Sequence, residues 1–130
     1  MLQGGMVTEY AYDVCPNPKP RQTQKDRWAL RPPVVRYRAF ADDCRAAGIT
    51  VENGDHIRFE LPMPPSWSAK RRAETLGQPH LQTPNIDNLA KALLDAVLPS
   101  DCAIWLISLE KRWAEQGRII VYRKKDTAGA

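Results

Sequence analysis

Amide, carboxylate and lysine side chains recur at short spacings in the second half of the chain. Asn85 and Asp87 are two residues apart, Lys91 follows Asp87 by four, and Asp101 and Lys111 come later. Residues four apart share one face of a helix, so Asp87 and Lys91 would lie side by side. Carboxylate oxygens are the ligands that Mg²⁺ prefers, and a metal so held polarises a phosphodiester and activates water. The spacing therefore predicts a small site for phosphodiester chemistry.

The site requires a helix to carry its first residues. Apolar residues recur at spacings of three and four over residues 86–98, which predicts a helix there. Thr83 resembles an N-cap and Pro84 the first helical position. Asp87 would then lie in the first turn, where free N–H groups and the helix dipole favour negative charge.

Asp101 comes directly before a predicted strand at 104–113. Because a helix and the strand after it usually pack together, Asp101 is expected to return beside the helix. A simpler interpretation stays open, in which Asp87 and Lys91 form an ordinary surface ion pair and Asp101 is a turn residue. The alternation of the strand predicts one apolar face, made of Trp105, Ile107, Leu109 and Trp113. This face is a candidate dimer surface, and its coverage by the helices is the alternative.

The remaining pattern predicts a small α+β domain. Its other elements are a strand at 10–15, a loop at 16–33, a helix at 34–47, a strand at 56–61, a loop at 62–84 and a strand at 118–123. The last strand is expected to pair with the strand at 104–113 as a hairpin. The order is β-α-β-α-β-β, with a mixed sheet packed by two helices. Residues 1–130 are expected to form one domain with flexible ends at 1–9 and 125–130.

Basic residues are concentrated in two segments. The formal charge is +4, from 19 Lys and Arg against 15 Asp and Glu. The first segment contains one acid, Asp26, and seven basic residues: Lys19, Arg21, Lys25, Arg27, Arg31, Arg36 and Arg38. The second is Lys70, Arg71 and Arg72. Such clusters suit a polyanion, because each neutralised phosphate releases counterions; a solvated loop is the alternative.

Composition and motifs argue against several other classes of protein. The cysteines Cys15, Cys44 and Cys102 are odd in number and form no CxxC pair, so neither a disulfide framework nor a zinc site is expected. The protein is instead expected in a reducing cytoplasm. The apolar stretches are shorter than the roughly 20 residues of a membrane helix, and no secretory signal is expected. No Walker A or GxGxxG motif indicates a nucleotide cofactor. His56 and His80 have no catalytic partner at a telling spacing.

Residues 84–96, PNIDNLAKALLDA, resemble the signature of the RusA family of Holliday-junction resolvases, roughly P-D-x-D-N-L-x-K-a-x-x-D-a. The family continues with two adjacent acids that open a strand ending in lysine, and here Ser100-Asp101 and Lys111 stand at these positions. Upstream, a first strand runs into the segment PNPKPR at 16–21. The resemblance covers about residues 10 to 125.

The resemblance implies a homodimeric endonuclease that uses Mg²⁺ or Mn²⁺ to make paired, symmetric nicks in four-way DNA junctions, in recombination and repair. Many members are encoded by phages and prophages. It implies that Asp87 and Asp101 are catalytic metal ligands and that Lys91 is a lysine needed for activity. The residues expected to contact DNA are Lys19, Arg21, Lys70, Arg71, Arg72 and Lys111, with Trp67 or Trp28 as candidates to stack at the junction centre.

Two residues depart from the family pattern. Ser100 replaces the first of the paired acids, and Asn85 replaces the first aspartate of the signature. The amide oxygen of Asn85 can still bind a hard cation, but it brings no negative charge, so the metal site is expected to be weaker. The enzyme would then need more metal or recruit another acid such as Glu60. A junction-binding protein that does not cut, or a small basic domain unrelated to DNA, is the alternative.

Overall fold

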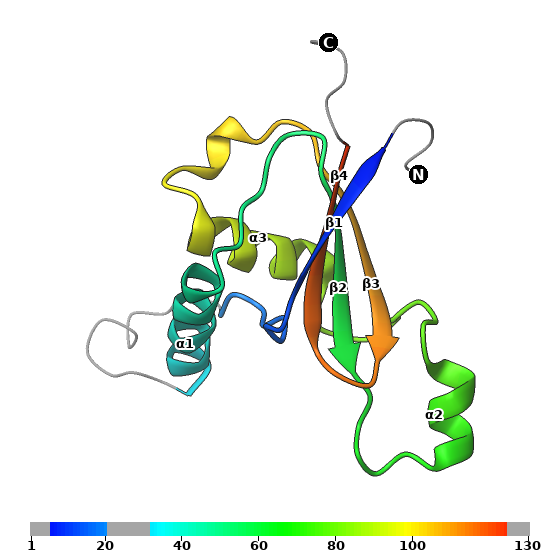
Figure 1. The fold of residues 1–130 in the computed structure, drawn as a ribbon. Helices are drawn as coiled ribbons and strands as arrows, with labels where there is room; N and C mark the ends of the chain where they lie inside the picture. Colours follow the sequence, from blue (N-terminus) through cyan, green and yellow to red (C-terminus); the bar gives the residue numbers. More distant parts are fainter. Residues whose placement is uncertain (1–5, 21–31, 125–130) are drawn as a thin grey trace.

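A mixed β-sheet and a layer of helices make up the computed structural model, which describes residues 6–20 and 32–124 (Figure 1). Within these residues the sheet contains β1 (Val7–Tyr12), β2 (His56–Pro62), β3 (Ser108–Ala114) and β4 (Arg118–Lys124). The strand order is β1-β4-β2-β3. β2 and β3 run parallel, while β4 is antiparallel to both β1 and β2. The predicted α+β class is confirmed.

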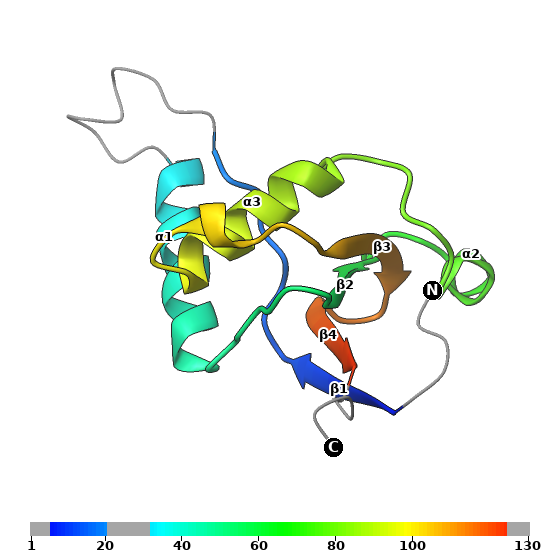
Figure 2. The ribbon, with the colours of Figure 1, turned by 90° about the horizontal axis from the view of Figure 1, so that it is seen from above.

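Two long helices cover one face of the sheet. α1 (Pro32–Ala46) and α3 (Ile86–Val97) pack against each other on the same side of the strands (Figure 2). Their buried residues recur at helical spacing, with Phe40, Ala41 and Cys44 on α1 and Leu89, Ala90 and Leu93 on α3. They meet the buried strand residues Ile57, Phe59, Ile119 and Val121 in one core. This core fixes α3, which carries most of the predicted site.

The opposite face of the sheet carries polar side chains, because residues alternate along each strand. We call it the open face and define it by His56, Arg58, Glu60, Ser108, Glu110, Arg112 and Arg118. His56 hydrogen-bonds Glu110 and, at 2.6 Å, Ser108. Burial raises the pKa of Glu110, but hydrogen bonds from Arg112 and His56 outweigh it and hold the pKa at about 2. The open face is thus crossed by a network of ion pairs.

Three predictions about the strands are wrong. β3 and β4 do not form a hairpin, because β2, the most buried strand, lies between them. β1 begins at Val7 rather than at residue 10, since β4 extends to Lys124 and pairs with Val7. β3 begins only at Ser108, so Trp105 lies outside the strand and is 78% exposed, whereas Trp113 is buried. The two tryptophans therefore do not share an apolar face.

The second predicted loop contains a short helix, α2 (Ala69–Thr75), beyond the end of β3 in Figure 1. Ser68 caps it by accepting a hydrogen bond of 3.1 Å from the backbone N–H of Arg71. None of its residues is buried, so no apolar periodicity marks it in the sequence. A single-turn helix, η2 (Asp101–Ala103), also follows α3.

The three cysteines are free thiols. Cys44 is fully buried in the core, and burial raises its pKa to about 12. Cys15 lies against Gly117 in the β3–β4 turn, where a Cβ atom on Gly117 would stand 2.8 Å from the Cβ and 3.0 Å from the Cα of Cys15. No helix in the described ranges has the length and apolar character needed to cross a membrane.

Candidate active site

The first part of the site is the N-terminus of α3. Its N-cap is Asn85 rather than the predicted Thr83, since the helix starts at Ile86, two residues later than predicted. The backbone carbonyl of Asn85 accepts hydrogen bonds from the N–H groups of Asn88 and Leu89 at 3.1 and 3.2 Å. Its side chain makes no capping hydrogen bond, so the amide oxygen is available for other ligands. Asp87 lies in the first turn, as predicted, and is exposed.

Asp101 lies in a turn, as the simpler interpretation of the sequence expected, but the bonds that hold this turn are not evident from the sequence. Asp101 begins η2, and the chain after it is fastened to Asn53 between α1 and β2. The Asn53 side chain donates to the carbonyl of Ala103 at 3.1 Å and accepts from the N–H groups of Trp105 and Leu106 at 2.8 and 3.3 Å. These three bonds fix the segment that connects Asp101 to β3.

Lys91 joins the two parts of the site. Its ammonium nitrogen lies 3.8 Å from a carboxylate oxygen of Asp101. Asp87 precedes Lys91 by one helical turn on α3, whereas the ion pairs of Lys91 are with Asp95 and Asp101. The helix-to-strand packing that the sequence predicts therefore does bring Asp101 back to α3. The Lys91 side chain is 57% exposed, so its charge is accessible to a ligand.

A second lysine reaches the same place from the opposite end of the sequence. Lys19, which follows β1, donates a hydrogen bond to Asp95, and Lys91 lies 3.8 Å from the same oxygen of Asp95. The hydrogen bond to Asp95 raises the pKa of Lys19, and the charge of Asp101 contributes in the same direction. Two lysines and two aspartates thus form one cluster, which we call the lysine–aspartate cluster: Lys19, Lys91, Asp95 and Asp101.

Lys111 supports the loop that leads into α3. It lies on the helix-covered face of β3, and its ammonium group donates to the backbone carbonyls of Gln82 and, at 2.8 Å, Pro84. Burial lowers its pKa. These bonds hold the residues that directly precede Asn85. A contact between Lys111 and DNA stays a prediction.

The predicted DNA-binding residues of α2 differ in their surroundings. Lys70 is exposed, while the guanidinium of Arg71 stacks 3.7 Å from the ring centre of Trp67. Arg72 donates to the Pro64 carbonyl at 2.8 Å and pairs with Glu115 at 2.6 Å, which fastens α2 to the β3–β4 turn. Arg21 and Trp28 lie outside the described residues.

Trp67 serves the packing of α2. Its ring centre is 4.9 Å from that of Trp113. Trp113 also contacts the buried His80, whose ring centre is 4.1 Å from its own. Burial and the nearby charge of Lys111 lower the pKa of His80.

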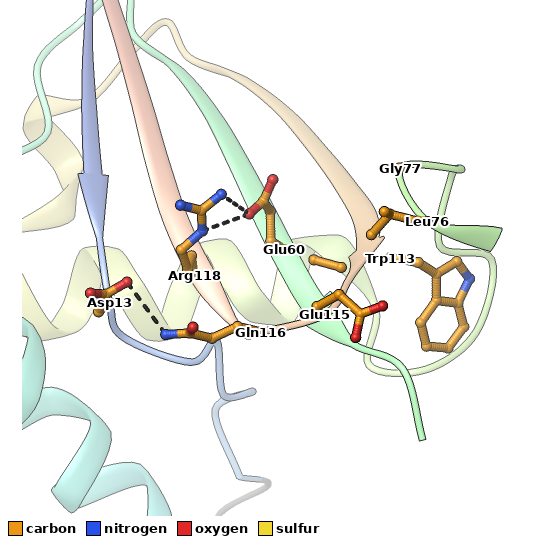
Figure 3. Close-up of a pocket in the computed structure, with 9 residues that line it drawn as sticks. Asp13, Glu60, Leu76, Gly77, Trp113, Glu115, Gln116 and Arg118 are labelled. Atoms are coloured by element: carbon orange, nitrogen blue, oxygen red, sulfur yellow. Dashed lines mark hydrogen bonds and ion pairs between the residues drawn. The ribbon is translucent and has the colours of Figure 1, made fainter. Parts of the chain in front are cut away.

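Glu60 lies away from Asp87 and Asp101. It alternates with the buried Phe59 along β2 and so points to the open face, where it accepts hydrogen bonds from Arg118 at 2.9 and 3.0 Å. Figure 3 shows this pair beside a pocket of about 390 Å³ between the sheet and the α2 region. Because α3 packs on the other face, recruitment of Glu60 by the predicted metal site is not supported.

The donor atoms near α3 suit a hard divalent cation. Asp87 and Asp101 are exposed carboxylates, and Asn85 offers an amide oxygen that the helix does not use. Among the described residues, no group of three or more His, Cys, Asp or Glu side chains could hold a metal. The donor types match those of a cation that keeps much of its water, with fewer charges than a site with three carboxylates.

Aspartates, an amide and two lysines lie at or beside α3, and these are the residue types expected of a site that acts on phosphate esters. The model of the family described as endodeoxyribonuclease RusA matches residues 12–122. The match covers most of the chain, so the chain belongs to the RusA endodeoxyribonuclease family, and membership implies an endonuclease that resolves Holliday junctions. No curated protein matches the chain.

Two positions of this site were missed by the sequence interpretation. Asn53 belongs to an Asn-Gly pair, which indicates a turn but not its partners. Asp95 is part of the signature helix and lies one turn after Lys91, a spacing that predicts their pairing.

Proposed function

We propose that the protein is a Mg²⁺- or Mn²⁺-dependent endonuclease that resolves four-way DNA junctions by paired, symmetric nicks. The observation that carries the proposal is the position of Lys91, one turn after Asp87 and 3.8 Å from Asp101. Two exposed carboxylates would supply a cation site, and the exposed ammonium of Lys91 would supply a positive charge for a phosphate. Family membership supplies the branched-DNA substrate class.

The chemistry of each side chain indicates the role that we propose for it. Asp87, Asp101 and the amide of Asn85 would hold the cation, which when bound polarises the scissile phosphate and lowers the pKa of water. Lys91 neutralises charge that develops on the phosphate, since its ammonium is exposed beside the carboxylates. Lys19 adds a second, less exposed positive charge, since its side chain is 27% exposed against 57% for Lys91.

We propose that the protein acts as a homodimer. A four-way junction has two scissile strands related by two-fold symmetry, so paired nicks require two sites related in the same way. Analytical ultracentrifugation should give a mass near twice the 14.7 kDa of the chain. A monomer at micromolar concentration that still makes paired nicks would refute this part.

A nicking assay on a synthetic four-way junction tests the proposal. Wild-type protein should make symmetric nicks that depend on added Mg²⁺ or Mn²⁺ and should leave a linear duplex of equal length intact. Asp87→Asn should abolish nicking while junction binding is retained. Asp43→Asn is the matched control, because it removes the same charge from an exposed position on α1. Nicking by Asp87→Asn at the wild-type rate would contradict the assignment of Asp87.

A second candidate function is favoured by Asn85. A site with two carboxylates holds a divalent cation less tightly than one with three, and a protein of this kind could bind junctions without cutting them. It would show salt-sensitive junction binding and no product at any Mn²⁺ concentration. The same assay, run with a metal titration, distinguishes the two functions.

A further inference from the structure

Asp95 stands out because the proposed chemistry does not use it. It lies on α3 one turn after Lys91, and its side chain is 22% exposed, less than that of Asp101 at 43%. One of its oxygens, Oδ2, faces both the ammonium of Lys19 and the ammonium of Lys91. A carboxylate shared by two lysines is already neutralised, so Asp95 is not a free metal ligand.

Lys19 approaches Asp95 on a constrained segment. Pro16, Pro18 and Pro20 alternate with the residues around Lys19, and each proline fixes its own φ. Pro16 is buried, and the Asn17 side chain donates to the Pro18 carbonyl at 3.0 Å. A backbone held in this way presents the lysine in few conformations.

The two ion pairs of the lysine–aspartate cluster differ in how exposed they are. The pair formed by Lys19 and Asp95 is the more buried part, and Lys91 and Asp101 are the more exposed part. Lys91 lies 3.8 Å from a carboxylate oxygen on each side, so its flexible side chain is held between two negative charges. Without Asp95, Asp101 would be the remaining anion that holds Lys91 in place, and Lys19 would lose its hydrogen-bonded partner.

We propose that Asp95 is a positioning residue that holds Lys19 and Lys91 side by side, so that both ammonium groups face the DNA phosphate bound next to Asp101. The inference rests on the proposed function. A lysine fixed before the phosphate arrives needs no reorganisation during the reaction, which is how a preorganised charge stabilises a transition state. Asp95 acts through the lysines and does not itself touch the substrate.

The test compares Asp95→Asn, Asp95→Glu, Lys19→Gln and the double variant Lys19→Gln/Asp95→Asn, with Asp43→Asn as the charge-matched control on the exposed side of α1. Junction affinity is measured without divalent metal, and the single-turnover nicking rate is measured with Mg²⁺ at saturating protein. Unfolding curves confirm that each variant is folded.

Asp95→Asn should slow single-turnover nicking about tenfold or more, because small displacements of catalytic groups have effects of this size. Its junction affinity should change by less than about threefold, since both lysines remain. Asp95→Glu should restore most of the rate. The double variant should be no slower than the slower single variant, because Lys19 and Asp95 act as one unit.

Three results would overturn the inference: nicking by Asp95→Asn at the rate of the Asp43→Asn control, a loss that Asp95→Glu does not restore, or effects of the two single variants that multiply. If the wild type makes no nicks, the endonuclease proposal fails, and junction affinity decides the inference alone. Lys19→Gln must then weaken binding less in the Asp95→Asn background than in the wild type. Equal effects in both backgrounds would refute the positioning role.

Discussion

Replacing Lys111 with methionine separates two roles for this lysine. In the structure its ammonium donates to the carbonyls of Gln82 and Pro84, directly before the N-cap Asn85. Methionine keeps the apolar stem of the side chain and removes the donor. Each hydrogen bond from a charged group stabilises a fold by about 1.5 to 3 kcal/mol, and bonds that share one donor are not additive. We therefore expect Lys111→Met to lower the free energy of unfolding by about 3 kcal/mol.

Urea denaturation followed by tryptophan fluorescence measures this loss, with Lys124→Met as the control because Lys124 is an exposed lysine at the end of β4. Nicking should also slow, about tenfold, since the loop that positions Asn85 becomes free to move.

A phosphate contact by Lys111 would give a different pattern. Removal of one phosphate contact reduces the slope of log affinity against log salt by about one and acts uniformly on junction sequences. Such a change, together with an unfolding free energy equal to that of Lys124→Met, would refute the loop-supporting role. A large stability loss with an unchanged salt slope would confirm it.

Three further predictions concern charge, packing and the metal. Glu110→Gln should destabilise the fold by up to about 3 kcal/mol at pH 7, because the folded-state pKa of Glu110 is about 2 against an ordinary value of 4.5. A lowered carboxyl pKa stabilises the fold above pH 4.5. The difference in denaturation midpoint between variant and wild type should therefore shrink as the pH falls from about 4.5 towards 2. A difference that stays constant over this range would contradict the role of Glu110. Gly117→Ala should lower the unfolding free energy by about 1 to 3 kcal/mol, because its new methyl group meets Cys15, and Cys15→Ala in the same chain should recover part of the loss. Asn85→Asp should lower the Mg²⁺ concentration that gives half-maximal nicking, since it adds a third carboxylate beside Asp87; an unchanged metal requirement would exclude Asn85 from the metal site.

The local parts of the fold were predictable from the sequence. α3, its first-turn Asp87 and the packing face of α1 follow from apolar spacing, and this spacing is confirmed by burial. The return of Asp101 to α3 follows from the rule that a helix packs on the strand after it. These predictions succeed because each depends on residues close in sequence.

The remaining parts depend on partners that a local pattern does not name. Alternation along β2 shows which side chains are buried, but not that β2 separates β3 from β4. The bonds of Lys111 go to backbone carbonyls, which every residue has. The pairing of Lys19 with Asp95 joins positions 76 residues apart, and no spacing rule covers such a distance.

The place of β4 in the sheet has a consequence for how the protein is made. Among the described residues β4 is the last strand, yet it lies between β1, the first, and β2. A growing or truncated chain that stops before Arg118 leaves β1 without its partner and one edge of the core uncovered. Because Lys19 lies on the segment that follows β1, we expect its pairing with Asp95 to depend on β4 as well. We therefore expect a chain that stops before Arg118 to retain Asp87 and Asp101 without the complete lysine–aspartate cluster.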